Sequence, residues 1–181
     1  MSQSLPRSNP FETSQRKLIP AVLVYLFYRG KVLMVHRNAE GRSGDYHAGK
    51  WNGLGGKLEA DESALGAAVR EVAEESGVSL EAAQLCALGT LHFPLFKPQR
   101  SEDWLAFLFR AELTPEQAQA AWKKGPEGDL HWVSQEDLNS LNLWAGDRYF
   151  IPKVVSSTPV LGTLWYRGQD VERVEFVELG R

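Results

Sequence analysis

The chain of 181 residues has little of what marks a secreted, membrane-spanning or nucleic-acid-binding protein. It has one cysteine, Cys86, so no disulfide can form within the chain, and we expect a reduced, structural thiol. A net charge of -3 gives no long-range attraction to DNA or to an anionic membrane. The longest apolar run, residues 18–28, has 11 residues, which is too short to span a bilayer, and it does not resemble a signal sequence. We therefore expect a cytoplasmic protein that binds neither nucleic acid nor membrane.

The composition is otherwise that of a globular protein. Hydrophobic residues make up 43% of the chain and charged residues 24%, which are ordinary values for a folded domain. The length is sufficient for one substantial core, and the sequence has no internal repeat or low-complexity tract. We expect a flexible N-terminal tail at residues 1–17, a single domain at residues 18–181, and a monomer.

The pattern of apolar residues and turn residues predicts many short strands and few helices. Arg29-Gly30 predicts the turn of a hairpin, and the glycine-containing residues 38–49 predict a mobile loop. Helices are expected in the segment that ends at Gly77, after Thr114, from Leu138 after a cap at residues 134–137, and from Gly146 onward. Strands are expected at residues 21–28, 32–37, 51–54, 85–93, 104–111, 130–133, 162–167 and 171–178. This order predicts an α/β (α+β) fold, an α/β/α sandwich around a mixed β-sheet.

The most informative feature is one pattern that covers residues 56–78, G-x5-E-x7-R-E-V-x-E-E-x-G-V. The acidic pair Asp61-Glu62 predicts the start of a helix, because negative charge suits its positive dipole end. Gly77 predicts the end of the helix, since glycine tolerates the left-handed cap. The stripe predicted to be buried has the spacing i, i+3, i+4 and i+7 and consists of Leu65, Ala68, Val69 and Val72.

Three glutamates, Glu71, Glu74 and Glu75, lie on the other side of that predicted helix. Like charges at this spacing cost about 0.2–0.5 kcal/mol a pair, and no lysine follows at i+4. A hard divalent cation, Mg²⁺ above all, would offset the repulsion with oxygen ligands. For the triplet alone a solvated acidic face is the alternative interpretation. The preceding Gly55-Gly56-Lys57 loop and Arg70 in the same register favour a metal site.

This segment resembles the signature box of the Nudix hydrolases, which cleave a diphosphate linked to a further group X. The resemblance implies a catalytic loop–helix–loop in which Glu62 pairs with Arg70 to hold the loop. It implies Mg²⁺ as cofactor, with Mn²⁺ as a second choice, and makes Glu74 and Glu127 the candidates for general base. The implied metal ligands are the Gly55 carbonyl, Glu71, Glu74, Glu75 and Glu127.

Outside the box, residues 18–179 resemble the MutT-like oxidised-purine nucleoside triphosphatases of the animal type. The resemblance rests on residues 50–57 (KWNGLGGK), 144–152 (WAGDRYFIP) and 162–170 (GTLWYRGQD). By matched position, Asn52 and Asp147 would hydrogen-bond the purine edge, and Trp144 would stack on the base. Arg37 and Lys57 are candidates to hold phosphate. The complete set of expected substrate-binding residues is Arg37, Asn52, Leu54, Gly56, Lys57, Phe93, Trp144 and Asp147.

Together these observations predict a Mg-dependent pyrophosphohydrolase that converts a purine nucleoside triphosphate, such as 8-oxo-dGTP, to the monophosphate and pyrophosphate. Gly146 stands where the subfamily has an aspartate, so the preference for an oxidised base stays open. Pro94 lies 16 residues beyond Val78, a spacing found in related ADP-ribose pyrophosphatases, which makes ADP-ribose the alternative substrate. An idle Nudix module that only senses a nucleotide is an alternative of another class, but such modules usually lose box glutamates.

Overall fold

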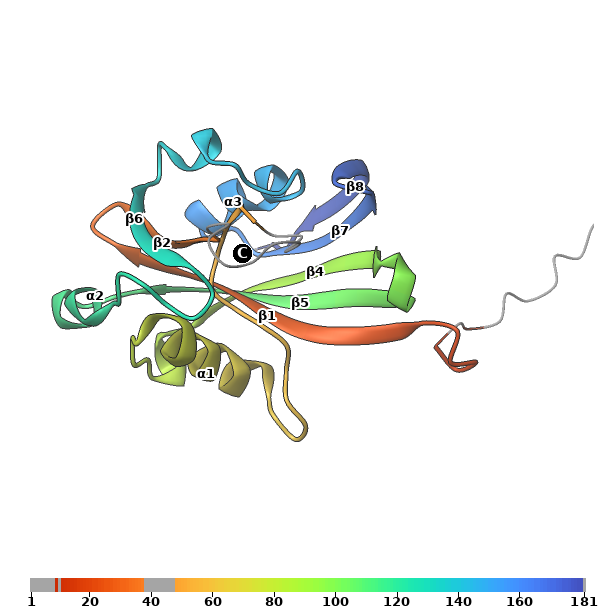
Figure 1. The fold of residues 1–181 in the computed structure, drawn as a ribbon, viewed down its shortest axis with the longest axis horizontal. Helices are drawn as coiled ribbons and strands as arrows, with labels where there is room; N and C mark the ends of the chain where they lie inside the picture. The colour runs from red at the N-terminus through yellow and green to blue at the C-terminus, as the bar shows by residue number, and fades with distance from the viewer. Residues whose placement is uncertain (1–8, 10, 38–47, 181) are drawn as a thin grey trace, which may run out of the picture.

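The structure, a computed structural model, describes residues 9, 11–37 and 48–180, and its frame is one mixed sheet of eight strands (Figure 1). The strand order is β3-β2-β1-β5-β4-β7-β8, and β6 also pairs with β2. β1 pairs in parallel with β5, and β4 with β7, whereas the other pairs are antiparallel. The strands are β1 Lys17–Tyr28, β2 Lys31–His36, β3 Trp51–Asn52, β4 Cys86–Lys97, β5 Glu102–Glu112, β6 Asp129–Ser134, β7 Val160–Arg167 and β8 Asp170–Glu178.

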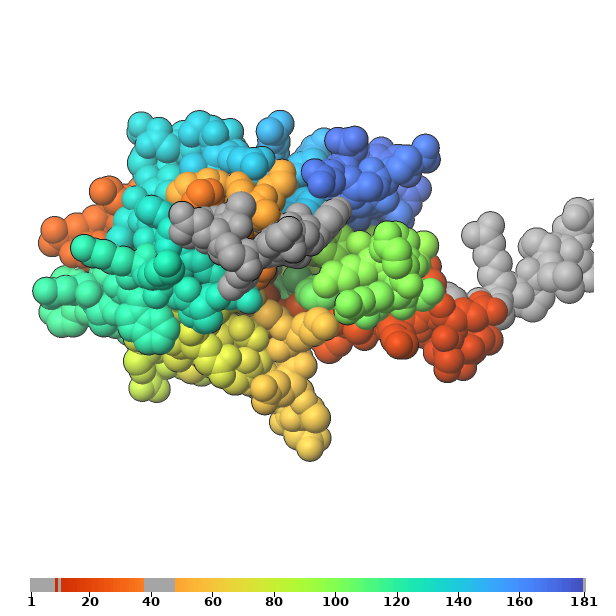
Figure 2. Space-filling model, viewed as in Figure 1, coloured from red at the N-terminus to blue at the C-terminus, as the bar shows by residue number. Residues whose placement is uncertain are grey.

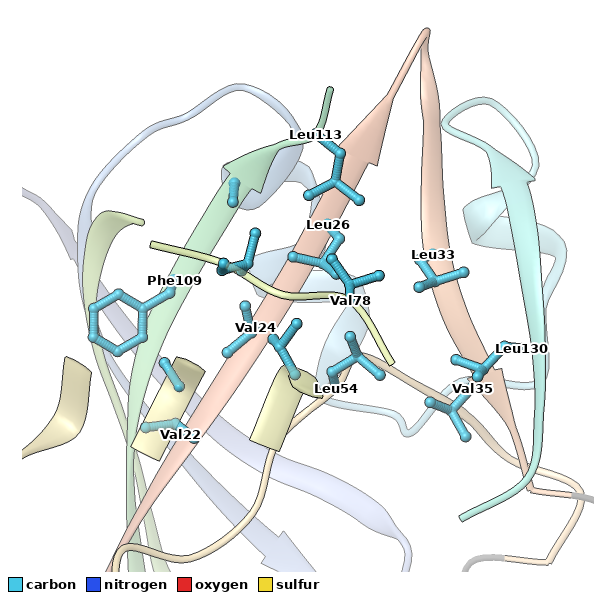
Figure 3. Close-up of a cluster of buried hydrophobic side chains, with 14 of the residues drawn as sticks. Val22, Val24, Leu26, Leu33, Val35, Leu54, Val78, Phe109, Leu113 and Leu130 are labelled. Carbon is cyan, nitrogen blue, oxygen red and sulfur yellow. The ribbon is translucent and has the colours of Figure 1, made fainter. Parts of the chain in front are cut away.

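Helices cover both faces of this sheet (Figure 1). α1 (Ala64–Ser76) lies on one face and α3 (Asp147–Val155) on the other, with the short α2 (Pro115–Ala120) after β5. The chain has two hydrophobic cores, one on each face of the sheet. Strand β1 contributes to both, because successive side chains of a strand point to opposite faces. Val24 and its neighbours pack with α1 in the cluster drawn in Figure 3, and Tyr25 packs with α3. The predicted α/β/α sandwich around a mixed sheet is confirmed.

Most predicted elements are present with small changes in their bounds. The β1–β2 hairpin turns at Arg29 and Gly30, whose φ angles are 48° and 74°, as the sequence predicted. α2 begins after the N-cap Thr114, and α3 begins after Gly146. β4 differs, because it does not end before Pro94 but continues to Lys97 through an irregular pairing with β5. The helix expected after residue 137 is a single 3₁₀ turn, Leu138–Ser140.

The start of α1 was predicted two residues too early. The N-cap is Ser63, whose hydroxyl accepts a hydrogen bond from the Gly66 N–H at 3.0 Å, and the acidic pair precedes the cap. The predicted buried stripe is also partly wrong, because Leu65 is 44% exposed, whereas Ala67 is fully buried. The predicted end is confirmed, since Gly77 has the left-handed φ of 73° and its N–H bonds the Ala73 carbonyl.

The N-terminal part of the chain is described only in part. Residues 1–8 and 10 of the predicted tail, and residues 38–47 of the predicted loop, lie outside the described residues. Arg16, also within the predicted tail, donates a hydrogen bond from Nε to the buried Asp103 carboxylate at 2.9 Å. The division at residues 17 and 18 stays a prediction. Among the described residues, no helix has the length and apolar character needed to span a bilayer.

Candidate active site

A cleft of about 560 Å³ opens over β1 and brings together residues that are far apart in the sequence. Its walls come from the loop after β3, from α1, from the β4–β5 hairpin and from the segments before β6 and α3. The cleft is therefore the place where the box and the MutT-like segments meet. Ten residues that the sequence singled out line it: Arg37, Asn52, Gly55, Gly56, Lys57, Glu71, Glu75, Phe93, Glu127 and Trp144.

The loop at residues 53–58 is bound to the edge of β1 and has no room for larger residues at its glycines. The Val22 N–H donates to the Gly56 carbonyl at 2.8 Å, and Val24 and Leu54 exchange two backbone hydrogen bonds. Gly55 has a φ of 141°, and a Cβ there would lie 2.1 Å from the Val22 carbonyl oxygen. A Cβ on Gly56 would lie 2.3 Å from Glu71 Oε1. The glycines therefore let the helix carboxylates approach the loop backbone.

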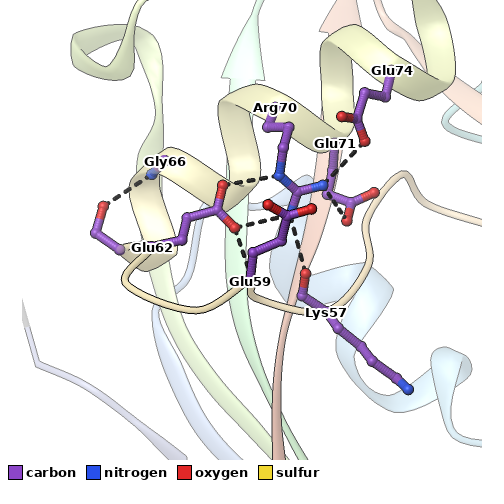
Figure 4. A network of polar contacts seen from close by, with 8 residues as sticks. Lys57, Glu59, Glu62, Gly66, Arg70, Glu71 and Glu74 are labelled. Carbon is purple, nitrogen blue, oxygen red and sulfur yellow. Dashed lines mark hydrogen bonds and ion pairs between the residues drawn. The ribbon is translucent and has the colours of Figure 1, made fainter.

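Arg70 connects the loop to α1 and uses all of its hydrogen-bonding nitrogens (Figure 4). Its Nε and one terminal nitrogen each bond Glu62 at 2.9 Å, which is the bidentate geometry of a strong arginine–carboxylate pair. The other terminal nitrogen bonds Glu71 at 2.9 Å and Glu74 at 3.1 Å. The pairing of Glu62 with Arg70 thus has the expected geometry. The like charges on α1 are offset by this arginine, which precedes Glu74 by four positions, whereas only a lysine after the glutamates was considered from the sequence.

Glu75 is the most strongly perturbed carboxylate of the box. It is 7% exposed, and burial raises its pKa to about 7, with the charge of Glu71 adding to the effect. The Gly55 N–H, which donates to Glu75 Oε2 at 2.9 Å, acts in the opposite direction. A buried carboxylate whose ionisation is this costly is one that a bound cation would stabilise.

The residues of this region fit a divalent cation. Glu71, Glu75 and Gly55 line the cleft together, and carboxylate and carbonyl oxygens are the donors that hard cations take. Within the described part of the chain, no three His, Cys, Asp or Glu side chains already lie grouped as a metal site, and Arg70 binds both Glu71 and Glu74. Glu74 itself does not line the cleft, and its side chain is 58% exposed.

Glu127 and Arg37 stand together at the cleft and form an ion pair. Glu127 was selected by matched position as a metal-site or base residue, and Arg37 was a candidate to hold phosphate. Gly128, next to Glu127, has no room for a Cβ, which would lie 2.2 Å from the His36 carbonyl oxygen. The segment that carries Glu127 therefore packs directly on the end of β2, which places the carboxylate beside Arg37.

The expected base-recognition residues lie at different depths. Asn52, Phe93 and Trp144 line the cleft, and Trp144 is only 6% exposed, so its ring is both a core and a cleft residue. Asp147 does not line the cleft; it lies beneath Trp144 and accepts a hydrogen bond from the Trp144 N–H at 3.3 Å. Leu54 is fully buried in the core and does not line the cleft either.

The environment of Gly146 explains why this chain has no side chain there. A Cβ would lie 2.1 Å from the Tyr166 hydroxyl oxygen, and the Gly146 N–H donates to that oxygen at 2.9 Å. The space that an aspartate would need is therefore taken by a tyrosine of β7. A Gly146→Asp substitution cannot simply restore the subfamily residue while Tyr166 stays in place.

Sequence reasoning missed four cleft residues on the β4–β5 hairpin: Phe96, Lys97, Trp104 and Ala106. Phe96 contacts the Trp104 ring edge-on, with centroids 5.9 Å apart, and Phe93 lies 5.6 Å from Phe96. The only signal in the sequence is the group of aromatic residues on both sides of a Pro-containing turn. That group is equally typical of core strands, so it did not indicate a site.

Comparison with known proteins identifies the family. The sequence profile described as the NUDIX domain matches residues 17–154. The chain belongs to the Nudix family. It is thus a Nudix hydrolase, an enzyme that acts on pyrophosphate bonds, and members of this family generally use divalent metal ions.

Curated relatives and solved structures agree with this assignment. The Nudix hydrolase described here is 28% identical over 155 residues to the oxidized purine nucleoside triphosphate hydrolase of Danio rerio, covering 86% of this chain and 90% of the relative. It is 26% identical over 126 residues to the enzyme of that name from Mus musculus, covering 69% and 75%. The MutT protein from Bacillus halodurans has the same fold, with a TM-score of 0.72, 24% identity, and 87% and 97% coverage. The NUDIX domain of Shewanella oneidensis NrtR, solved with ADP ribose, superposes with a TM-score of 0.59, 19% identity, and 80% and 91% coverage.

Proposed function

We propose that this Nudix hydrolase is a Mg²⁺-dependent pyrophosphohydrolase of purine nucleoside triphosphates, which yields the monophosphate and pyrophosphate. The observation that carries the proposal is the composition of one cleft. Box carboxylates, cationic side chains and aromatic rings all line the same cavity of about 560 Å³. This combination suits a substrate that joins a flat base to a chain of phosphates. Nucleotides with an oxidised purine, such as 8-oxo-dGTP, are the first substrates to test, since both curated relatives are named oxidized purine nucleoside triphosphate hydrolases.

Within this proposal the carboxylates of Glu71 and Glu75 hold the cation, together with the Gly55 carbonyl. When bound, Mg²⁺ supplies charge neutralisation on the phosphates and lowers the pKa of water. Arg70 orients Glu71 and ties α1 to the loop. Glu74 bonds the same Arg70 nitrogen as Glu71 but does not line the cleft.

The remaining polar side chains bind the phosphates and move the proton. Lys57 and Arg37 donate to phosphate oxygens, because both are cations at the cleft. The Glu127 carboxylate accepts the proton of the attacking water, and its ion pair with Arg37 holds it at the cleft. Glu127 is preferred to Glu74 as the base because Glu127 lines the cleft and Glu74 does not.

For the base, we propose that Trp144 and Phe93 stack on the purine and that the Asn52 amide hydrogen-bonds its edge. Asp147 supports this arrangement from beneath, through the Trp144 backbone. Cytoplasmic location and a monomeric state are further expectations from the sequence and stay predictions.

The experiment is a substrate panel of dGTP, 8-oxo-dGTP, dATP, dCTP and ADP-ribose with Mg²⁺, in which products are identified by chromatography. Asn52→Ala should lower kcat/KM for the preferred purine about 5- to 100-fold, the effect of losing one hydrogen bond in a cleft, and should affect dCTP much less. Asn139→Ala is the matched control, because Asn139 is an exposed amide outside the cleft. Equal loss on purines and pyrimidines, or no hydrolysis of any triphosphate, would contradict the proposal.

Hydrolysis of ADP-ribose is the second candidate function. It is favoured by the structure of the NrtR NUDIX domain, which was solved with ADP ribose. The panel separates the two, because ADP-ribose would yield AMP and ribose phosphate without pyrophosphate. A chain that binds ADP-ribose and cleaves nothing would support the idle sensing module instead.

A further inference from the structure

The hairpin of β4 and β5 adds a cationic group to the cleft that neither the box nor the MutT-like segments include. Lys97 lies over the Trp104 ring, with its Nζ 4.6 Å from the ring centroid. Lys57, from the box loop, lies over the same ring at 5.4 Å. The two ammonium groups are thus at most 10.0 Å apart, the sum of 4.6 and 5.4. All three residues line the cleft.

Lys97 stands in an environment that disfavours its own charge. Its pKa is lowered, first by burial and then by the charge of Lys57, with Arg100 and Arg37 contributing in the same direction and Glu102 opposing. Within the described part of the chain, no carboxylate lies within ion-pair distance of Lys97. The ring of Trp104 offers only the weak stabilisation of a cation–π contact. An anion that binds between the two lysines would remove this repulsion.

The position of Lys97 is fixed by the irregular end of β4. Phe93 pairs with Trp104 and Lys97 with Glu102, so residues 94–96 of β4 lie opposite Asp103 alone. The buried Asp103 carboxylate accepts from the Leu95 N–H at 2.9 Å and is held by Arg16. Bulges of this kind redirect side chains near functional sites. In the space-filling view this hairpin end, in green, stands at the surface beside the gold segment that contains Lys57 (Figure 2).

We propose that Lys97 and Lys57, which both contact the Trp104 ring, form an anion subsite that binds the terminal phosphate of the substrate. Lys97 is then a specificity-determining residue, which makes the enzyme prefer nucleoside triphosphates to nucleoside diphosphates. Trp104 is the positioning residue that holds the two cations at their separation. The inference rests on the proposed function, because it concerns the phosphate end of the same substrate.

The test is Lys97→Met, which keeps the apolar stem on Trp104 and removes the charge. The ratio of kcat/KM for dGTP to that for dGDP should fall by about 10-fold or more, since hydrogen bonds to charged groups are the stronger ones. Lys97→Arg should keep the ratio close to that of the wild type. Arg100→Met is the matched control, because Arg100 is an exposed cation on the same turn that does not line the cleft. Its ratio should change little.

A binding measurement without turnover makes the test independent of catalysis. Isothermal titration of inorganic triphosphate in EDTA should show binding to the wild type, about 10-fold weaker binding to Lys97→Met, and little change for Arg100→Met. Equal affinities of wild type and Lys97→Met, or equal losses on dGTP and dGDP, would overturn the inference. Lys97→Gln is a second variant that removes the charge. If its melting temperature equals that of the wild type, its loss of affinity cannot come from a folding defect. If the wild type hydrolyses no triphosphate, the proposed function fails, while the titration still decides whether Lys97 binds phosphate.

Discussion

The buried carboxyl group of Asp147 should make the stability of this chain fall as the pH rises. Asp147 is 8% exposed, and burial raises its pKa to about 7, with the Trp144 N–H and the charge of Lys50 opposing the shift. The ordinary value is 3.8, so the folded chain binds this proton more tightly than the unfolded chain does. The contribution to stability is therefore complete below about pH 4 and is lost as the pH rises to about 7.

Asp147→Asn removes the titration and keeps an oxygen that can accept the Trp144 N–H. The two pKa values differ by about 3, and each unit corresponds to about 1.36 kcal/mol, which gives an upper value of about 4 kcal/mol. We expect the variant to match the wild type near pH 4 and to be more stable at pH 8 by up to about 4 kcal/mol. At this chain length, such a difference raises the melting temperature by up to about 8–16 °C.

The assay is urea unfolding of both proteins between pH 4 and pH 8, followed by tryptophan fluorescence. Taking the difference between variant and wild type cancels the titration of all groups that the two share. Asp170→Asn is the matched control, because Asp170 is an exposed aspartate at the start of β8, and its difference should stay near zero. A difference for Asp147→Asn that is constant across this pH range, or a variant less stable at pH 8, would refute the reasoning.

Three further predictions concern the metal region and the base end of the cleft. Glu75→Gln should lower kcat at least about 100-fold while keeping or raising the melting temperature above pH 7, measured by product formation and by a thermal scan. Millimolar Mg²⁺ should raise the wild-type melting temperature relative to EDTA, and the rise should be larger at pH 8 than at pH 6, because the cation binds ionised Glu75. Equal melting temperatures in Mg²⁺ and in EDTA, at pH 6 and again at pH 8, would count against the site. Gly146→Asp should cost about 1–3 kcal/mol in urea unfolding through the clash with Tyr166, and adding Tyr166→Phe should recover part of this loss.

The box could be predicted from the sequence because its interactions are local. Glu62, Arg70 and Glu74 lie within 12 positions of one another; helix geometry brings Arg70 to Glu74, and the loop just before the helix brings Glu62 to Arg70. The errors there were of the same local kind. Asp61 and Ser63 are both acceptable N-caps two positions apart, and only the hydrogen bond from Gly66 shows that Ser63 has that role.

The depth of the proposed base-recognition residues could not be predicted in the same way. Asp147 and Leu54 were selected because they match positions of the MutT-like family, but such a match does not show whether a side chain reaches the cleft. Asp147 lies beneath Trp144 because α3 packs its first turn against the sheet, and Leu54 faces α1 because it pairs with Val24. Burial of this kind depends on packing across layers, which no single segment encodes.

The cationic end of the cleft, at Lys97 and Lys57, is the part of the site that local sequence patterns could not predict. Lys97 and Trp104 meet Lys57 only because the end of β4 is irregular, and that irregularity is held by the Asp103 carboxylate. Asp103 in turn is bound by Arg16, which is 87 positions away in the sequence. A strand pattern read along residues 85–93 ends at Pro94 and gives no reason to continue to Lys97. The proposed phosphate end of the site is therefore set by a contact between distant parts of the chain, whereas the proposed metal end is set within one helix and its loop.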